Sequence, residues 1–234
     1  MTPTEAKTRR RRDPESTRAS ILEAAKTILA QDGAEGLSVS SVAKLAGVNR
    51  GTAYQHFQVK EDLVRATLDW VSHQLLDAVF EGGDLGGERP ENLPKPDLEH
   101  LPDVINGMAA FNLRLAEYAI ENPDIGRIWL YDVLSRKNPK EDVFYKRFEQ
   151  ALSGLAMSDA GEEDMDPEVL SVLMLAGYFL WPVWVRSQAR SKKDRKAMAR
   201  RYAGEVMRLS MHGVLRTDSH VILKTYLKKH LLNS

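Results

Sequence analysis

The 234-residue chain carries 33 Lys and Arg and 33 Asp and Glu, so its formal net charge is zero and no overall field favours a polyanion or a membrane. It contains no cysteine, which excludes disulfides and thiolate metal sites and suits a reducing cytoplasm. The charge is unevenly placed, because residues 1–60 hold ten basic and six acidic side chains, a local excess of +4 that favours a module meeting nucleic acid.

The N-terminal residues carry charges without an apolar run after them, and no stretch of about 18 uninterrupted apolar residues occurs in the chain. We therefore expect a soluble cytoplasmic protein with no membrane partner. Four consecutive arginines, Arg9 to Arg12, could lie along a DNA groove or across phosphates. A solvated terminal tail explains them slightly better, and the choice stays open at this point.

Apolar residues recur at helical spacing almost throughout the chain, and runs of strict alternation are missing. The sequence therefore predicts an all-α protein of about nine or ten helices. The first helix is expected from about Pro14 to Gln31. It should stop at the following DGAEG segment, where Gly33 and Gly36 can supply the left-handed backbone geometry that ends helices.

Two short helices follow. Ser38 is a natural N-cap for the first of them, and Leu37 can pack on Val42 as a hydrophobic staple. Gly47 then breaks the chain, and Asn49 should cap a third helix that runs to about Phe57. Two short helices separated by a tight glycine turn have the spacing of a helix-turn-helix.

A long fourth helix is predicted from Lys60 to Phe80, and a surface loop follows at 82–96, which holds four glycines and three prolines. Further helices are predicted at 102–121, 123–137, 139–156, 167–190, 192–215 and 218–232. The first three of these have proline at or near the first turn, where its missing N–H costs little. Pro182 should kink the helix that contains it.

The third short helix has two unlike sides. At about 100° per residue, Ala53 and Phe57 share one arc, whereas Arg50, Gly51, Thr52, Tyr54 and Gln55 occupy the rest, with His56 on the border. The wider arc holds no acid and several hydrogen-bond donors, and Gly51 gives up about 1 kcal/mol of helix propensity. Such an arc favours a partner rich in acceptors, as duplex DNA is.

The stretch from 36 to 63 reads GLSVSSVAKLAGVNRGTAYQHFQVKEDL and resembles the DNA-binding region of the TetR family of bacterial transcriptional regulators. The shared pattern is an alanine-rich second helix, a glycine turn, and Tyr-x-His-Phe followed by Lys-Glu-x-Leu. The likeness extends over about residues 15–75. It implies a helix-turn-helix DNA-binding domain at 15–75 and a larger helical domain for effector binding and dimerisation at 76–234.

The resemblance also implies which residues meet operator DNA. Contacts with phosphates or bases are expected from Ser40, Asn49, Arg50, Thr52, Tyr54, Gln55, His56 and Lys60, while Gly51 lets the backbone approach a phosphate strand. Arg50 and Gln55 can read guanine and adenine edges, although either could bind phosphate instead. Tyr54 and Lys60 should only position the domain. For His56, capping and packing form an equal alternative.

Two residues depart from the family pattern. Ala53 stands where a larger aliphatic residue is usual, which predicts a lighter contact with the first helix. Val59 stands at a position that is often Ser or Asn, which predicts a loss of about 1 kcal/mol of capping for the fourth helix. Glu61 and Asp62 should partly offset this loss through the helix dipole.

The later helices contain many aromatic residues and methionines at helical spacing. For each one alone, a place in the core is the simpler interpretation. Together with the family resemblance, they predict a cavity for a small, largely apolar or aromatic effector. The candidate lining residues are Met108, Phe111, Trp129, Phe144, Phe148, Met174, Tyr178 and Trp181.

The helices at 167–190 and 192–215 are too apolar for one subunit to cover, and by analogy with the family they should pair with a second copy as a four-helix bundle. The leading hypothesis is a homodimeric repressor that leaves a near-palindromic operator when the effector binds. The alternative is an activator, or a DNA-binding protein without an effector. An enzyme is disfavoured, because no nucleophile with a base beside it, phosphate loop, metal-ligand spacing or cofactor motif is found.

Overall fold

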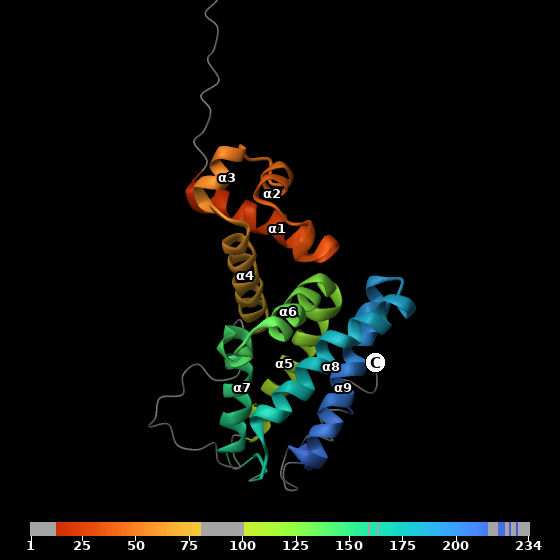
Figure 1. Ribbon diagram of the computed structural model, residues 1–234. Helices are drawn as coiled ribbons and strands as arrows, with labels where there is room; N and C mark the ends of the chain where they lie inside the picture. The colour runs from red at the N-terminus through yellow and green to blue at the C-terminus, as the bar shows by residue number, and fades with distance from the viewer. Residues whose placement is uncertain are drawn as a thin grey trace, which may run out of the picture. The chain divides into compact units, whose positions relative to one another are not determined.

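The computed structural model describes residues 13–80, 101–158, 160–162 and 164–214, together with 220–222, 225 and 228. In these parts of the chain the regular secondary structure is helical and no β-strand is formed, which confirms the all-α prediction (Figure 1). The basic arm at Arg9 to Arg12, the predicted loop at 82–96 and most of the predicted helix at 218–232 lie outside the described residues.

Nine α-helices and one 3-10 helix make up the described chain. They are α1 Pro14–Gly36, α2 Val39–Leu45, α3 Arg50–His56, α4 Lys60–Phe80, α5 Leu101–Glu121, α6 Pro123–Ser135, η1 Pro139–Glu141, α7 Val143–Ala156, α8 Pro167–Gln188 and α9 Lys192–Gly213. The chain divides into two compact units, Met1–Trp70 and Val71–Ser234. The division falls within α4, so that one continuous helix contributes to both units.

Helix α1 is interrupted near its end. Gly33 adopts φ 67° and ψ −171°, and one more helical turn follows it to Gly36. The prediction for Gly33 is therefore confirmed, whereas the prediction for Gly36 is wrong, because the positive φ angles in the described chain belong to Gly33 and Gly47. The N–H of Leu37 bonds to the carbonyl of Ala34 and closes this last turn.

The first unit has a small core built by the long helix α1, the short helices α2 and α3, and the start of α4. Ile21, Val42, Ala53 and Leu63 are fully buried, one from each helix. Burial on one side of each helix follows from apolar residues spaced three and four apart. The guanidinium carbon of Arg18 lies 4.6 Å from the ring centroid of Phe57, which adds a cation–π contact at the edge of this core.

The second unit is built around α5, which packs along α8 and α9, while α6 and α7 pack against α8 (Figure 1). Helix α7 begins at Val143, so the prediction of one helix from Pro139 is wrong. Pro139–Glu141 forms a separate 3-10 turn, and Asp142 stands between the two at φ −62° and ψ 131°. That extended backbone stops the turn from continuing, and it places Asp142 as the N-cap of α7.

Helix α8 continues through the buried Pro182 and ends at Gln188, two residues short of its predicted end. The kink predicted at Pro182 stays a prediction. Among the described residues, α8 is the one helix whose length and apolar composition would also suit a membrane span. A helix that pairs with a second chain can have the same apolar composition. It buries apolar residues in its own subunit on one side and exposes an apolar stripe to the partner on another.

Candidate nucleic-acid interface

The α2–turn–α3 segment is held by local capping bonds. The Ser38 hydroxyl accepts a hydrogen bond from the N–H of Ser41 at 3.0 Å, and the Ser41 hydroxyl accepts one from the N–H of Ser38 at 3.0 Å. This reciprocal pair is a capping box, which satisfies two N–H groups that a helix start leaves without partners. Gly47 then takes φ 64° and turns the chain toward α3, as predicted.

Asn49 caps α3. Its side-chain oxygen accepts a hydrogen bond from the N–H of Gly51 at 2.8 Å, and its backbone carbonyl accepts one from Ala53 at 3.1 Å. The cap predicted at Asn49 is confirmed. Because the amide oxygen already serves the helix, the amide nitrogen is the donor that Asn49 can offer to DNA.

The two sides of α3 differ in exposure as its sequence predicts. Ala53 and the following Phe57 are buried. The opposite arc reaches solvent, with Arg50, Gly51, Tyr54 and Gln55 exposed and Thr52 and His56 half-buried. The donor-rich arc is thus free of the subunit core, which is necessary for DNA contact. The contacts themselves stay a prediction.

Tyr54 joins two other predicted contact residues. The hydroxyl oxygens of Ser40 and Tyr54 lie 3.5 Å apart, and the guanidinium carbon of Arg50 lies 5.5 Å from the Tyr54 ring centroid. These neighbours, Ser40 before Arg50, lower the pKa of the exposed Tyr54 hydroxyl. Residues from α2 and α3 are therefore gathered at one exposed point, an arrangement that the sequence alone does not reveal.

Lys60 opens α4 at the far end of this segment and is half-buried. Its ammonium group lies 3.5 Å from the carbonyl oxygen of Glu35, in the last turn of α1. A lysine in such a position is held near the helix-turn-helix while its remaining N–H groups can reach a phosphate. Val59, just before it, is exposed, and its carbonyl accepts a long hydrogen bond of 3.4 Å from Leu63.

The candidate effector residues lie in the second unit, and most of them are buried. Met108, Phe111, Trp129, Phe144, Phe148 and Tyr178 are buried, whereas Met174 and Trp181 are half-buried. Trp129 lies 5.6 Å from Phe144 and 4.9 Å from Phe179, measured between ring centroids. The rings thus form one aromatic cluster, and their predicted role in lining a cavity stays a prediction.

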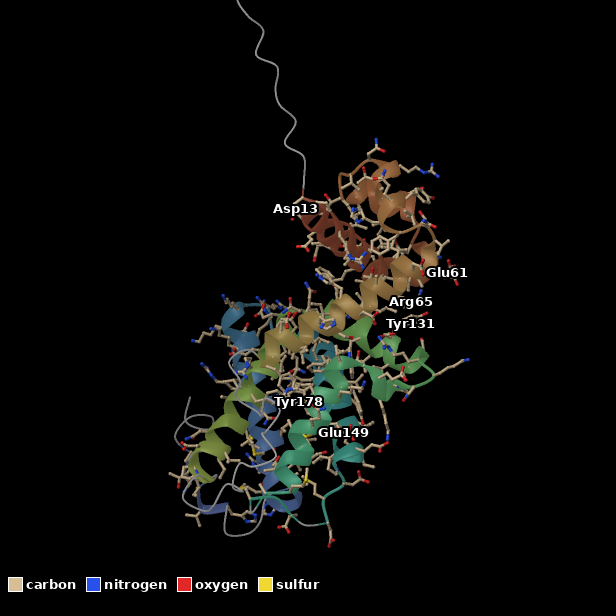
Figure 2. The ribbon with its side chains drawn as sticks, turned by 90° about the vertical axis from the view of Figure 1, so that its left-hand side faces the viewer. Asp13, Glu61, Arg65, Tyr131, Glu149 and Tyr178 are labelled. Atoms are coloured by element: carbon tan, nitrogen blue, oxygen red, sulfur yellow. The ribbon has the colours of Figure 1, made fainter. Side chains whose placement is uncertain are left out.

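A buried amide lies beside this cluster and was missed by the sequence analysis. Asn112 accepts a hydrogen bond from the hydroxyl of Tyr178, a buried residue labelled in Figure 2, and its own amide nitrogen donates to the carbonyl of Met108 at 2.7 Å. Burial raises the pKa of Tyr178 well above its usual value. The sole sequence signal was a polar residue among apolar ones on α5, which does not identify its partner 66 positions away.

Within the described residues, no group of three or more His, Asp or Glu side chains is placed to hold a metal ion.

The N-terminal helices of the chain are similar in sequence to known proteins. The family model described as "Bacterial regulatory proteins, tetR family" matches residues 21–67. The HTH-type transcriptional regulator TtgR of Pseudomonas putida is 41% identical over 61 residues, which are 26% of this chain and 29% of TtgR. The DNA-binding transcriptional repressor TetR of Mycobacteroides abscessus is 35% identical over 71 residues, 30% of this chain and 37% of that one. The chain thus matches well under half the length of these relatives.

The similarity of fold extends further than the similarity of sequence. The crystal structure of a TetR family transcription regulator from Marinobacter aquaeolei VT8 superposes with a TM-score of 0.62 at 19% identity, covering 86% of this chain and 96% of that one. The matched proteins are regulators, and none of those named is an enzyme. The segment that holds the helix-turn-helix therefore matches the TetR family of bacterial transcriptional regulators, and the described helices share the fold of a solved TetR-family structure.

Proposed function

We propose that the protein is a cytoplasmic, homodimeric repressor that binds a near-palindromic DNA operator through α3 and is released by a small, largely apolar or aromatic effector. The exposed side of α3 carries this proposal. It presents Arg50, Tyr54 and Gln55 to solvent, and none of its residues is acidic. A short helix with this surface, preceded by a capped helix and a glycine turn, is suited to the major groove.

The side chains divide by the part of DNA they can reach. Arg50 can donate two hydrogen bonds to a guanine edge, and Gln55 can pair with adenine, so these two are proposed to read sequence. Tyr54, Lys60 and Ser40 are proposed to hold phosphates, with Gly51 lying where the backbone comes close to the strand. Asn49, Thr52 and His56 flank this surface and complete the proposed contact set.

The second subunit is proposed to bind an apolar stripe on α8. The exposed apolar residues there are Val169, Val172, Leu173, Leu180, Val183 and Trp184, all at least half exposed. Their spacing of three, four and seven puts them on one side of the helix, and Leu209 on α9 is 74% exposed. Pairing α8 and α9 with the same helices of a twofold partner would bury this stripe and set two α3 helices about 34 to 36 Å apart.

The effector is proposed to enter among the aromatic rings of the second unit and to shift α4. Because α4 is continuous from Lys60 to Phe80, a displacement at its later turns reaches the start of the helix. The available free energy is the difference between the ligand's affinities for the two states. Release follows because a changed α4 no longer lets both half-sites be met together.

In the alternative proposal the protein still binds DNA, but it is a transcriptional activator or a DNA-binding protein without a small-molecule effector. The mutual packing of the rings, with centroids 4.9 to 6.4 Å apart, is the observation that favours a protein without an effector. A thermal-shift screen with a panel of apolar and aromatic compounds distinguishes the two. Stabilisation by a compound supports the effector, since a ligand that binds only the folded state raises its stability; no response across the panel supports the alternative.

Operator binding is tested by selecting duplexes from a random pool with the wild-type protein and measuring affinity at fixed salt. Arg50→Ala should weaken binding by about 1–3 kcal/mol and relax the base preference. Tyr54→Phe and Lys60→Ala should weaken binding to all sequences alike. Arg127→Ala removes an exposed arginine from α6 and serves as the control of equal charge. Enrichment of no duplex by the wild type, or an Arg50→Ala variant with unchanged affinity and preference, refutes the proposal.

A further inference from the structure

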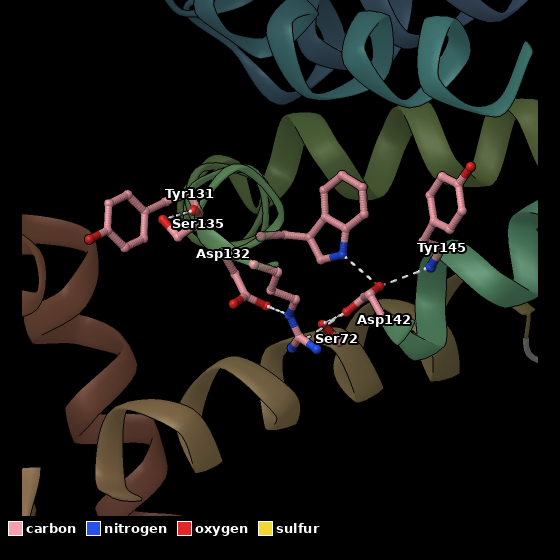
Figure 3. A network of polar contacts seen from close by, with 8 residues as sticks. Ser72, Tyr131, Asp132, Ser135, Asp142 and Tyr145 are labelled. Carbon is pink, nitrogen blue, oxygen red and sulfur yellow. Dashed lines mark hydrogen bonds and ion pairs between the residues drawn. The ribbon is translucent and has the colours of Figure 1, made fainter. Parts of the chain in front are cut away.

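A buried carboxylate joins three helices of the second unit. Asp142 is 1% exposed. One of its oxygens accepts a hydrogen bond from the N–H of Tyr145 at 2.9 Å, which caps α7, and another from the indole N–H of Trp129 on α6 at 3.0 Å. Its other oxygen accepts a hydrogen bond from the hydroxyl of Ser72 on α4 (Figure 3). A single side chain therefore connects α4, α6 and α7.

The charge of this carboxylate is also balanced locally. Arg136 lies with a guanidinium nitrogen 3.9 Å from Asp142, and its Nε donates to Asp132 at 2.7 Å. A buried carboxylate is tolerated when hydrogen bonds and an opposite charge replace the lost water. Both oxygens of Asp142 are engaged, so a change at one partner alters what the carboxylate can offer to the others.

Trp129 belongs to two groups at once. Its indole N–H donates to Asp142, while its rings lie against Phe144 and Phe179 in the aromatic cluster. The indole is rigid, so a shift of the ring within the cluster moves its N–H relative to Asp142. Hydrogen bonds weaken steeply with distance and misalignment. The packing of the cluster and the bond to Asp142 are thus geometrically linked.

Ser72 is the contact of α4 with this group. A buried hydroxyl in a helix commonly donates to the carbonyl four residues earlier, and Thr67 in the same helix does so, to Leu63 at 2.7 Å. Ser72 is equally buried but donates across helices to Asp142, 70 residues away. Ser72 is therefore the tie between α4 and Asp142. Farther along α4, the Val79 carbonyl accepts a hydrogen bond from Arg114 at 2.7 Å, and the Phe80 ring lies 5.0 Å from Phe111.

We propose that Asp142 is a positioning residue. Through its hydrogen bonds with Trp129 and Ser72, it makes the position of α4 depend on how the aromatic cluster is packed. The inference rests on the proposed function, in which α4 sets the position of α3, the helix proposed to read the DNA sequence. A compound that displaces the Trp129 ring would weaken or redirect the bond to Asp142, and the Ser72 bond would change with it. An undisturbed cluster keeps α4 in its DNA-binding position.

The link can be measured without a ligand or an operator. The full-length protein labelled with ¹⁵N shows the side-chain indole N–H signals of its four tryptophans, and the signal lost in Trp129→Phe identifies Trp129. Ser72→Ala should shift this signal, because Asp142 then has one donor fewer. Thr67→Val is the matched control, since it removes a buried hydroxyl of the same helix that bonds only within α4. A Trp129 signal unmoved by Ser72→Ala, or moved equally by Thr67→Val, overturns the proposal.

Amide hydrogen exchange tests whether the two bonds act together. Ser72→Ala and Trp129→Phe should each speed amide exchange in the second half of α4 by about tenfold. The double variant should exchange little faster than either single variant, because both substitutions break the same chain of contacts. Effects that multiply in the double variant would show independent bonds and overturn the proposal. Should Trp129→Phe fail to fold, the indole signal in Ser72→Ala decides alone, and Trp129 is assigned by replacing the other three tryptophans, Trp70, Trp181 and Trp184, one at a time.

Operator affinity separates this inference from the proposed function. Ser72→Ala should bind a selected duplex about three- to tenfold more weakly with the same base preference, because fewer dimers hold α4 correctly. Unchanged affinity despite a shifted indole signal overturns the positioning role while leaving operator binding intact. Failure of the wild type to select any duplex refutes the proposed function, and the indole and exchange measurements still decide whether the three contacts are coupled.

Discussion

The side-chain oxygen of Asn49 accepts the N–H of Gly51 at 2.8 Å, and a Cβ added to Gly51 would lie 3.3 Å from that same oxygen. The first turn of α3 therefore depends on both residues: Asn49 caps the helix, and Gly51 has no Cβ that would crowd the capping oxygen. Both residues lie on the exposed surface proposed to meet DNA. Substitutions at these two positions can separate the contribution of each residue to the stability of the helix from its contribution to DNA binding.

Asn49→Ala should lower the free energy of unfolding by about 1 kcal/mol, because the cap of α3 is lost. Asn49→Asp should retain the cap, since aspartate is an equally good N-cap residue. It should nevertheless bind DNA at least about tenfold more weakly, because it places a negative charge beside phosphates. Chemical denaturation and a DNA titration at fixed salt give the two quantities. Full DNA affinity in Asn49→Asp would exclude Asn49 from the interface.

Gly51→Ala should leave the folded protein as stable as the wild type or more stable by up to about 1 kcal/mol, because alanine favours the helix. Its methyl group stands where the backbone is proposed to approach a phosphate, so DNA binding should weaken for all sequences alike. Thermal melting and duplex titration check the two parts. A large loss of stability would instead mean that Asn49 cannot yield to the new Cβ at 3.3 Å.

Leu173→Glu should convert the proposed dimer to a folded monomer, because it places a charge in the middle of the apolar stripe on α8, where Leu173 is 66% exposed. Sedimentation equilibrium measures the mass, and circular dichroism verifies the fold. Operator affinity should fall with the dimer, since one reading helix then contacts one half-site. Leu134→Glu on α6 is the control, as Leu134 is 84% exposed outside the stripe. Equal effects of both substitutions would argue against the proposed pairing.

Tyr202 should make the protein less stable in alkali. Burial raises the pKa of its hydroxyl to about 12 from a usual value of 10.0. Below pH 10 both folded and unfolded states hold the proton, so its effect is constant; between about 10 and 12 the unfolded state loses the proton first, and stability falls as pH rises. Tyr202→Phe keeps the stacking on Trp181 and should show a shallower fall across this range. Denaturant midpoints measured at several pH values provide the check.

The sequence by itself was sufficient for the local features of the DNA-binding segment. Ser38 and Asn49 cap their helices, Gly33 takes a positive φ, Gly47 separates the two short helices, and α3 divides into buried and exposed sides as predicted. These outcomes depend on neighbours only a few positions away, because caps, glycine turns and helical spacing are local. Even so, the same local rule failed at Gly36, where one more helical turn was completed instead.

The tertiary structure decided what local rules leave open. Pro139 starts only a 3-10 turn, and α7 begins after Asp142, whose carboxylate caps the helix and also accepts hydrogen bonds from Ser72 on α4 and Trp129 on α6. The bond between Tyr178 and Asn112 likewise joins positions 66 apart. Local propensity gives each such residue several acceptable partners. Which partner it meets is settled when whole helices pack, because burial forces each polar group to find a donor or acceptor across the core.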